Sequence, residues 1–200
     1  MRQKVEAAAH QLGYHPNVLA SSLTTGRTKL IGLVSDNFHN PFFLEIFDKF
    51  TIGLQRLGLR PLLLNLSEPV LPLQAVSMLR QYSVDGVIVA SSTLPTEFAR
   101  AFHDSGIPVV HAFGRATTEP SVPIVTIDNQ RCGAMAAATL VARGYQSIGF
   151  MGGPENATST EDRWQGFAEE MAKHRDIAVT CSFAEAYTCL LYTSPSPRDS

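Results

Sequence analysis

Side chains that suit the binding of a small polar molecule stand directly after apolar runs of the sequence. Phe42 and Phe43 are neighbours near the start of a predicted helix, so one ring can enter the core while the other lines a cleft. Ser91 and Ser92 follow a predicted strand, where a hydroxyl can bond a ligand, although serines at such places are commonly turn residues. Asp128 ends another strand and can orient a ligand or cap the next helix, and capping is the favoured interpretation.

Arg163 carries the group best suited to bind hydroxyls or a carboxylate, because a planar guanidinium presents five N–H donors in a fixed fork. A surface ion pair is the plainer interpretation of the same residue. Ser159 stands four residues earlier, in a loop segment that could equally serve to cap the following helix. We therefore expect Arg163 to be the main polar contact of a ligand, with Ser159 as a weaker candidate.

Motifs of enzyme chemistry are missing from the sequence. No G-x-G-x-x-G follows the first predicted strand, and no G-x-x-x-x-G-K-[ST] occurs. The six histidines are scattered without metal-binding spacing, and the paired serines lack the nucleophile elbow G-x-S-x-G. The three cysteines are widely spaced without C-x-x-C, which indicates incidental thiols rather than disulfides or a metal site. We expect no catalytic residue, no metal and no cofactor.

The candidate side chains are positioned by an alternation of strands and helices that begins at residue 29. Strands are predicted over 29–35, 60–66, 85–90, 107–112, 124–128, 147–151 and 177–181, and helices over 41–57, 70–81, 95–103, 130–143 and 162–172. Such alternation predicts an α/β fold with a doubly wound parallel sheet. Ligands in these sheets bind beyond the carboxyl ends of the strands, where most of the candidate side chains stand.

The first 28 residues are a different kind of sequence. Apolar positions recur at helical spacing from Arg2 to Leu12, and Gly13 can end that helix. After Pro16, Asn17 can cap a short second helix that Gly26 closes. A helix of about two turns is marginal alone in water, so we expect it to need a partner surface.

The second helix and the residues after it share a specific spacing, namely Tyr14-x-Pro16-Asn17-x-x-Ala20-x-x-Leu23-x-x-Gly26-x-Thr28, then a strand and Asn40-Pro41-Phe42-Phe43. This spacing resembles the hinge and first sensor segment of lactose-repressor-type (LacI/GalR) transcriptional regulators. In that family the hinge helices of a dimer fold on the operator and insert a leucine into the minor groove. The resemblance therefore implies DNA contacts by Asn17, Ala20, Leu23 and Arg27.

One departure from the family concerns the hinge itself. Ser21 stands where the family usually has arginine, which removes a cation close to DNA phosphates or the minor groove. Residues 1–28 nevertheless carry a net charge of +2, against −4 for the remainder, a weak sign of a nucleic-acid face. We expect a hinge that contacts DNA more weakly than is usual in the family.

Later landmarks resemble the type I periplasmic-binding-protein-like sensor of the same family: Asp85-Gly86-Val87-Ile88-Val89, Gly144-Tyr145-x-x-Ile148-Gly149-Phe150 and Arg163-x-x-Gly166-Phe167. The resemblance implies a headpiece remnant and hinge over 1–28 and an effector-binding domain over 29–188. Its first lobe would cover 29–143, and 144–188 would start a second lobe. In the family the aromatic pair borders the effector pocket and the arginine points into it. We therefore expect the effector to contact Phe42, Phe43, Ser92, Asp128, Ser159 and Arg163.

Both ends of the sequence depart from the family pattern. The helix-turn-helix that precedes the hinge in the family is not in the sequence, nor is most of the second lobe, so we expect a fragment of marginal stability. Residues 189–200 resemble translated sequencing-adapter read-through, and a native Ser/Pro-rich tail is the alternative. In either case we expect this tail not to pack.

The functional expectation combines these observations. With 44% hydrophobic and 17% charged residues, no apolar run of membrane-spanning length and no secretory signal, the sequence indicates a cytoplasmic globular protein. The resemblance implies a non-enzymatic repressor that binds operator DNA as a homodimer and senses a sugar or sugar acid. One alternative is a periplasmic-type sugar-binding protein of the same fold, which would begin with a signal peptide. A nucleotide-dependent oxidoreductase is the second, and it would require a cofactor loop that the sequence does not provide.

Overall fold

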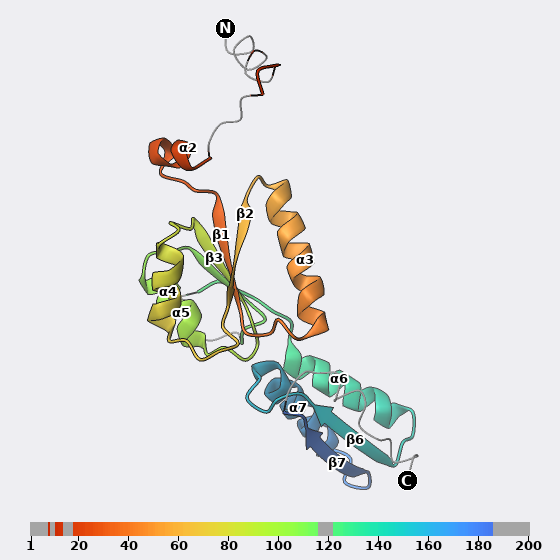
Figure 1. Cartoon of the computed structure of the whole chain (residues 1–200). Coiled ribbons are helices and arrows are strands. Elements are labelled where there is room, and N and C mark those ends of the chain that lie inside the picture. Colours follow the sequence, from red (N-terminus) through yellow and green to blue (C-terminus); the bar gives the residue numbers. More distant parts are fainter. Residues whose placement is uncertain (1–7, 9–10, 14–17, 116–121, 186–200) are drawn as a thin grey trace.

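Strands rich in valine, leucine and isoleucine form the centre of the first of two α/β units (Figure 1). In the computed structural model, which describes residues 8, 11–13, 18–115 and 122–185, five of them form a sheet in the order β2-β1-β3-β4-β5. These strands are β1 (Leu30–Ser35), β2 (Arg60–Asn65), β3 (Gly86–Ala90), β4 (Val109–Ala112) and β5 (Ile124–Val125). Every pairing within the sheet is parallel, so the predicted fold class is confirmed.

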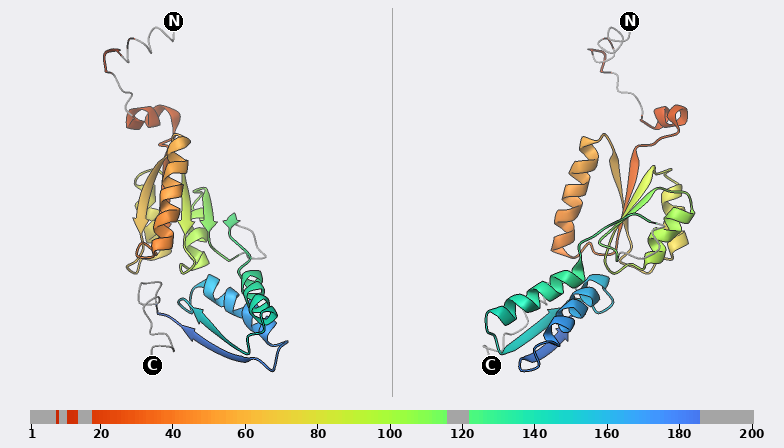
Figure 2. Two further views of the ribbon diagram at one scale, coloured as in Figure 1. Left: turned by 90° about the vertical axis from the view of Figure 1, so that its right-hand side faces the viewer. Right: turned by 180° about the vertical axis from the view of Figure 1, so that it is seen from behind.

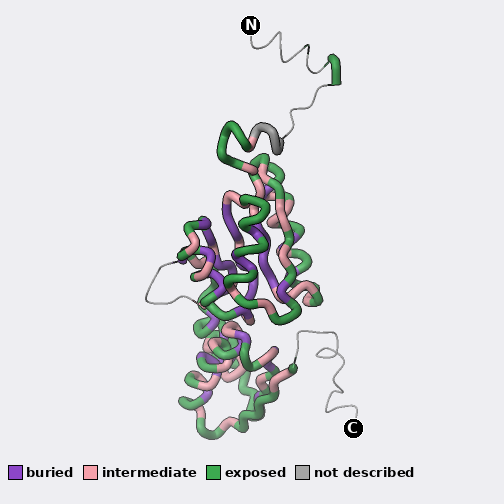
Figure 3. The backbone as a smooth tube through the Cα atoms, turned by 60° about the vertical axis from the view of Figure 1, so that its left-hand side comes forward, coloured by how far each residue is buried: buried purple, intermediate pink, exposed green. Residues whose placement is uncertain are grey.

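Helices cover both faces of this sheet (Figure 1). α3 (Pro41–Arg56) lies on one face, and α4 (Pro72–Arg80) and α5 (Thr96–Asp104) lie on the other. The largest core cluster lies between the sheet and the α4 and α5 pair, where Leu79 and Phe102 are almost fully buried. Figure 3 shows the buried backbone concentrated in these central strands. The apolar faces that the sequence periodicity predicts are therefore the ones that pack.

A second, smaller unit follows the five-stranded sheet along the chain (Figure 2). It consists of α6 (Asn129–Ala142), α7 (Thr158–Met171) and a parallel pair of strands, β6 (Ser147–Gly152) and β7 (Ala178–Phe183). Ala137, Ile148 and Phe167 form part of its core. Because α6 packs against α7 rather than on the first sheet, we propose moving the predicted lobe boundary from 143/144 to about Asp128.

The two helices of the second unit approach one another at glycines. A Cβ atom added to Gly133 would overlap the carbonyl oxygen of Arg163, and one added to Gly166 would overlap the carbonyl oxygen of Gln130. Each glycine thus faces the backbone of the other helix, which leaves no room for a side chain. This contact fixes α7, and with it Arg163, against the start of α6.

The short predicted hinge helix is present as α2 (Val18–Thr25), which lies apart from the sheet (Figure 1). Gly26 closes it as predicted, with a left-handed φ of 66° and an N–H that donates to the Ser22 carbonyl at 2.8 Å. The Leu23 side chain is 90% exposed. Asn17, most of the predicted helix over 2–12 and the segment 189–200 lie outside the described residues.

The segment between α2 and β1 is held by one carboxylate. Asp85 accepts a hydrogen bond from the Thr28 N–H at 3.1 Å and another from the Lys29 N–H at 2.9 Å. The Thr28 hydroxyl also donates to the carbonyl of Ser83 at 2.7 Å. The connection from α2 into the sheet is therefore anchored to the loop that precedes β3.

Element boundaries differ from the sequence prediction in two places that matter for the site. α7 begins at Thr158, four residues before the predicted start. Its N-cap residue is Ala157, which makes no side-chain cap hydrogen bond, so the sequence carries no capping signal for this start. β5 ends at Val125 instead of Asp128, since the chain leaves the sheet there to enter the second unit. No helix among the described residues has the length and apolar character needed to cross a membrane.

Candidate functional site

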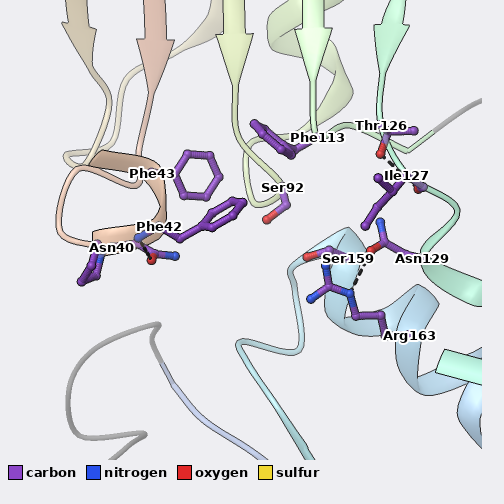
Figure 4. Close-up of a pocket in the computed structure, with 11 residues that line it drawn as sticks. Asn40, Phe42, Phe43, Ser92, Phe113, Thr126, Ile127, Asn129, Ser159 and Arg163 are labelled. Carbon is purple, nitrogen blue, oxygen red and sulfur yellow. Dashed lines mark hydrogen bonds between the residues drawn. The ribbon is translucent and has the colours of Figure 1, made fainter. Parts of the chain in front are cut away.

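A cavity of about 630 Å³ lies at the carboxyl ends of β1, β3, β4 and β5 and is closed on one side by the second unit (Figure 4). It is lined by Asn40, Pro41, Phe42, Phe43, Ser92, Phe113, Thr126, Ile127, Asn129, Ser159 and Arg163. The strand order reverses next to β1, and this is the place where doubly wound sheets bind ligands. The cavity is large enough for a ligand of mono- or disaccharide size.

One wall of the cavity is aromatic. The Phe43 ring is 4% exposed and packs into the core, whereas Phe42 is 55% exposed, so the two neighbours divide the roles as the helical spacing predicts. Phe113 meets both rings edge to face, with centroids 5.9 Å from Phe42 and 5.4 Å from Phe43. Phe113 holds a left-handed backbone conformation (φ 70°), which is costly for a bulky residue. The resulting wall offers an apolar aromatic surface to a ligand.

The opposite wall carries the polar groups. Arg163 lies one helical turn after Ser159, so both side chains point from the same face of α7 toward the cavity (Figure 4). The Arg163 Nε–H donates to the Asn129 side-chain oxygen at 2.9 Å, which fixes the plane of the guanidinium. Among the described residues, no carboxylate lies within ion-pair distance of Arg163. Its terminal nitrogens are thus available to a ligand.

The paired serines after β3 have separate tasks. The Ser91 side chain is fully buried; its hydroxyl donates to Asp36 at 2.6 Å and accepts from the backbone N–H groups of Thr93 and Leu94. Asp36 also accepts from the Thr93 hydroxyl. Ser91 therefore fixes the loop, and Ser92 between the two pinned residues is the serine that reaches the cavity.

Asp128 is not among the residues that line the cavity, so the structure gives no support to the effector contact predicted for it. Its carboxylate accepts from the Arg131 N–H at 2.9 Å and caps α6, which was the favoured interpretation of this residue. The structure brings the other five predicted cavity residues together. Sequence reasoning missed five non-proline lining residues, namely Asn40, Phe113, Thr126, Ile127 and Asn129. Their common signal is position, because all five follow β1, β4 or β5 in the structure within five residues. The predicted strand 124–128 obscured this for Thr126 and Ile127, since it placed both of them inside the strand.

The predicted DNA-contacting residues stand elsewhere. Ala20 and Leu23 belong to α2, Arg27 is exposed just after it, and α2 lies at the opposite end of β1 from the cavity (Figure 1). Asn17 lies outside the described residues. The structure thus separates the two predicted sites by the length of the first sheet.

His111 lies behind the cavity wall on β4. It is 3% exposed, and its Nε2 is 3.1 Å from the Ser91 carbonyl oxygen, so Nε2 carries the proton because a carbonyl can only accept. Burial lowers the pKa of His111 below its ordinary value, and the bond to Ser91 opposes this only in part. The ring is held neutral next to the loop that supplies Ser92.

We expect acid to destabilise the protein through His111. Because its pKa in the folded state is below the ordinary value of 6.5, the unfolded chain takes up a proton first, so stability is complete above about pH 6.5 and is lost as pH falls below it. His111→Gln removes this titration. Between about pH 7 and pH 5 the thermal midpoint of the parent protein should fall roughly 2–4 °C further than that of the variant. His103→Gln, at an exposed histidine, is the control, and parallel curves for His111→Gln and the parent would contradict this expectation.

Comparison with known proteins identifies the family of the chain. Residues 28–183 match the family described as periplasmic binding proteins and sugar binding domain of LacI family. The chain is 29% identical to the maltose regulon regulatory protein MalI of Escherichia coli, with 97% of this chain and 60% of that protein covered. It is 34% identical to the sucrose operon repressor of Streptococcus mutans, with 85% of this chain and 52% of that protein covered. The chain thus spans about half the length of the curated relatives it matches.

Solved structures show the same fold. A LacI-family transcriptional regulator from Silicibacter pomeroyi is similar with a TM-score of 0.69 and 29% identity, covering 92% of this chain and 56% of that one. The lac repressor dimer bound to operator and an anti-inducer is similar with a TM-score of 0.77, over 95% of this chain and 58% of that one. At 20% identity, the second likeness concerns the fold alone. With most of its length matched, this chain belongs to the family of periplasmic binding proteins and sugar-binding domains of LacI-type regulators.

Proposed function

We propose that the chain is the effector-sensing part of a ligand-responsive transcriptional repressor that binds operator DNA as a homodimer. The effector is a small sugar or sugar acid held in the cavity between the two units. Because such a regulator must bind chromosomal DNA, we expect it in the cytoplasm. This proposal is supported by the family match and by relatives that are named as regulators of sugar operons.

The chemistry of the cavity supports an effector of this class. The exposed Phe42 ring can cover the C–H face of a sugar ring, and the Arg163 fork can donate to adjacent hydroxyls or to a carboxylate. Ser92 and Ser159 add hydroxyls from the two units. Among the described lining residues Arg163 alone is ionisable, so the cavity supports binding rather than acid–base catalysis.

The observation that carries the regulatory part of the proposal is α2. The helix has eight residues, lies apart from the sheet and leaves Leu23 90% exposed. An exposed leucine on a short helix is what insertion into the DNA minor groove requires, whereas the binding of a small ligand alone does not call for it. An effector that binds both units favours one arrangement of them, and any shift reaches α2 through the anchored Thr28–Lys29 segment. Effector and DNA affinities would then change reciprocally.

The first test identifies the effector. Thermal unfolding of the chain is followed with a panel that contains maltose, sucrose, ribose, xylulose, fructose 1-phosphate and glucuronate. A compound present at about a hundred times its Kd should stabilise the protein by about 2.7 kcal/mol, which raises the midpoint by several degrees. No stabilisation by any sugar, sugar phosphate or sugar acid would count against the proposed effector class.

The second test addresses DNA. The complete gene product is used to select duplexes from a random library, with and without the compound found in the first test. We expect enrichment of one palindromic sequence and an affinity that changes when the compound is present. Stabilisation by a sugar without any selected duplex would favour the second candidate, a periplasmic-type sugar-binding protein, which the family description also covers.

A further inference from the structure

The first turn of α7 contacts two loops of the first unit. Thr158 donates to the Ser92 carbonyl oxygen twice, from its backbone N–H at 2.9 Å and from its hydroxyl at 3.2 Å. Ser92 belongs to the loop after β3 and lines the cavity. One edge of the cavity is thus a direct hydrogen-bonded contact between the two units.

The loop after β4 makes the second contact, through Arg115. Its Nη2 lies 2.6 Å from the Glu161 carboxylate and 2.6 Å from the Asp162 carboxylate, both in the first turns of α7. The same nitrogen approaches the Thr158 carbonyl oxygen at 3.5 Å. Hydrogen bonds that Arg115 donates to the Asp162 and Glu161 carboxylates hold the pKa of Arg115 above its ordinary value.

One of the two ion pairs that Arg115 makes is partly shielded from solvent. The Asp162 side chain is only 17% exposed and that of Arg115 is 39% exposed, so solvent screens the Arg115–Asp162 pair less than a fully exposed one. One guanidinium facing two carboxylates is also geometrically constrained. Both acidic groups stand near the amino end of α7, where the helix dipole favours negative charge.

These contacts determine the position of the polar wall of the cavity relative to its aromatic wall. Ser159 and Arg163 reach the cavity from α7, which otherwise packs within the second unit against α6. Their distance from the aromatic wall therefore depends on how α7 is held against the first unit. We infer that Arg115, together with Asp162 and Glu161, is a positioning residue that sets this distance by clamping the first turn of α7 to the loop after β4.

The contact of Arg115 with Asp162 and Glu161, called the clamp from here on, is tested at the neighbouring hydrogen bond from the Thr158 N–H to the Ser92 carbonyl. Residue-resolved amide hydrogen exchange is recorded for the parent chain and for Arg115→Gln, with attention to the Thr158 N–H that donates to Ser92. Loss of the clamp should raise the exchange rate of Thr158 roughly fivefold, the size expected for a partly buried ion pair. The amides of Ala172 inside the second unit and of Ala178 between β6 and β7 should keep their rates.

Arg175→Gln serves as the matched control, because Arg175 is an exposed arginine of the same unit for which the described residues show no ion pair. It should leave the Thr158 exchange rate unchanged. An unchanged Thr158 rate in Arg115→Gln would overturn the inference. An equal rise at Thr158, Ala172 and Ala178 would overturn it as well, since Arg115 would then serve the general stability of the fold.

A double-mutant cycle separates the ion pair from other effects of each side chain. Asp162→Asn should raise the Thr158 exchange rate in the same direction, and Arg115→Gln with Asp162→Asn should add little to the larger single effect. Full additivity of the two changes would show that the residues act independently and would overturn the clamp. The measurement uses neither effector nor DNA, so its outcome is independent of the proposed function.

Discussion

Replacing Gly166 with alanine is expected to disrupt the second unit. The new Cβ would overlap the carbonyl oxygen of Gln130 and lie 3.0 Å from its Cα, and backbone atoms cannot rotate away as a side chain can. Separating two packed helices to admit a methyl group costs about 3 kcal/mol or more. Gly133→Ala should behave alike, because its Cβ would meet the Arg163 carbonyl. Circular dichroism during heating should show a midpoint lower by roughly 10 °C, or loss of the transition.

The chain provides a matched control in α3. Gly53 also lies inside a helix, but a Cβ added there has no neighbour within 4 Å. Gly53→Ala should therefore raise stability by about 0.5–1 kcal/mol, since alanine is the better helix former. A Gly166→Ala variant that unfolds at the same temperature as the parent would show that the helices are not in backbone contact.

Replacing Arg163 with glutamine is expected to abolish most of the effector affinity. The guanidinium is held in place by Asn129 and offers its terminal N–H groups to the cavity, and hydrogen bonds from a charged donor contribute about 1.5–3 kcal/mol. Isothermal titration with the compound identified by thermal unfolding should give a Kd raised about 10- to 100-fold. The thermal midpoint without ligand should change little, because the exposed arginine supports no ion pair among the described residues.

Two further variants sharpen this measurement. Arg163→Lys keeps the charge but loses the planar fork, so affinity restored by lysine would indicate a simple charge contact, whereas continued loss would indicate bidentate binding of hydroxyls or a carboxylate. Arg131→Gln, in the neighbouring helix and outside the cavity, should leave the Kd unchanged. Unaltered affinity in Arg163→Gln would remove Arg163 from the effector site.

Much of the fold could be predicted because strand and helix periodicities are local properties. The apolar run that became β1 and the cap formed by Asn40 are visible in a few residues, and the rule that ligands bind at carboxyl ends of strands then locates the cavity. Ser159 and Arg163 stand four residues apart in the sequence, and both were predicted to contact the ligand. The structure adds that both lie in α7, which places them on one face.

The remaining features depend on pairings between distant segments, which periodicity does not encode. Asp36 has no local signature, yet its carboxylate binds Ser91 and Thr93 of another loop and so separates the task of Ser91 from that of Ser92. Gly133 reads as an ordinary helix residue until α7 is packed against it. The same packing is the reason for the lobe boundary that we propose near Asp128, since the sequence pattern of α6 does not reveal which sheet it joins.

Trp164 has a practical consequence, because it is the single tryptophan of the chain. Its ring lies 5.1 Å from that of Phe150, 6.0 Å from that of Phe167 and 6.1 Å from that of Phe183, all within the second unit. Its emission therefore reports the melting of that unit alone, while the amide circular dichroism signal reports both. Coincident curves from the two probes would mean that the units melt as one cooperative body, and separated curves would give each its own melting temperature. The molecule thus contains an intrinsic optical label for one of its two units.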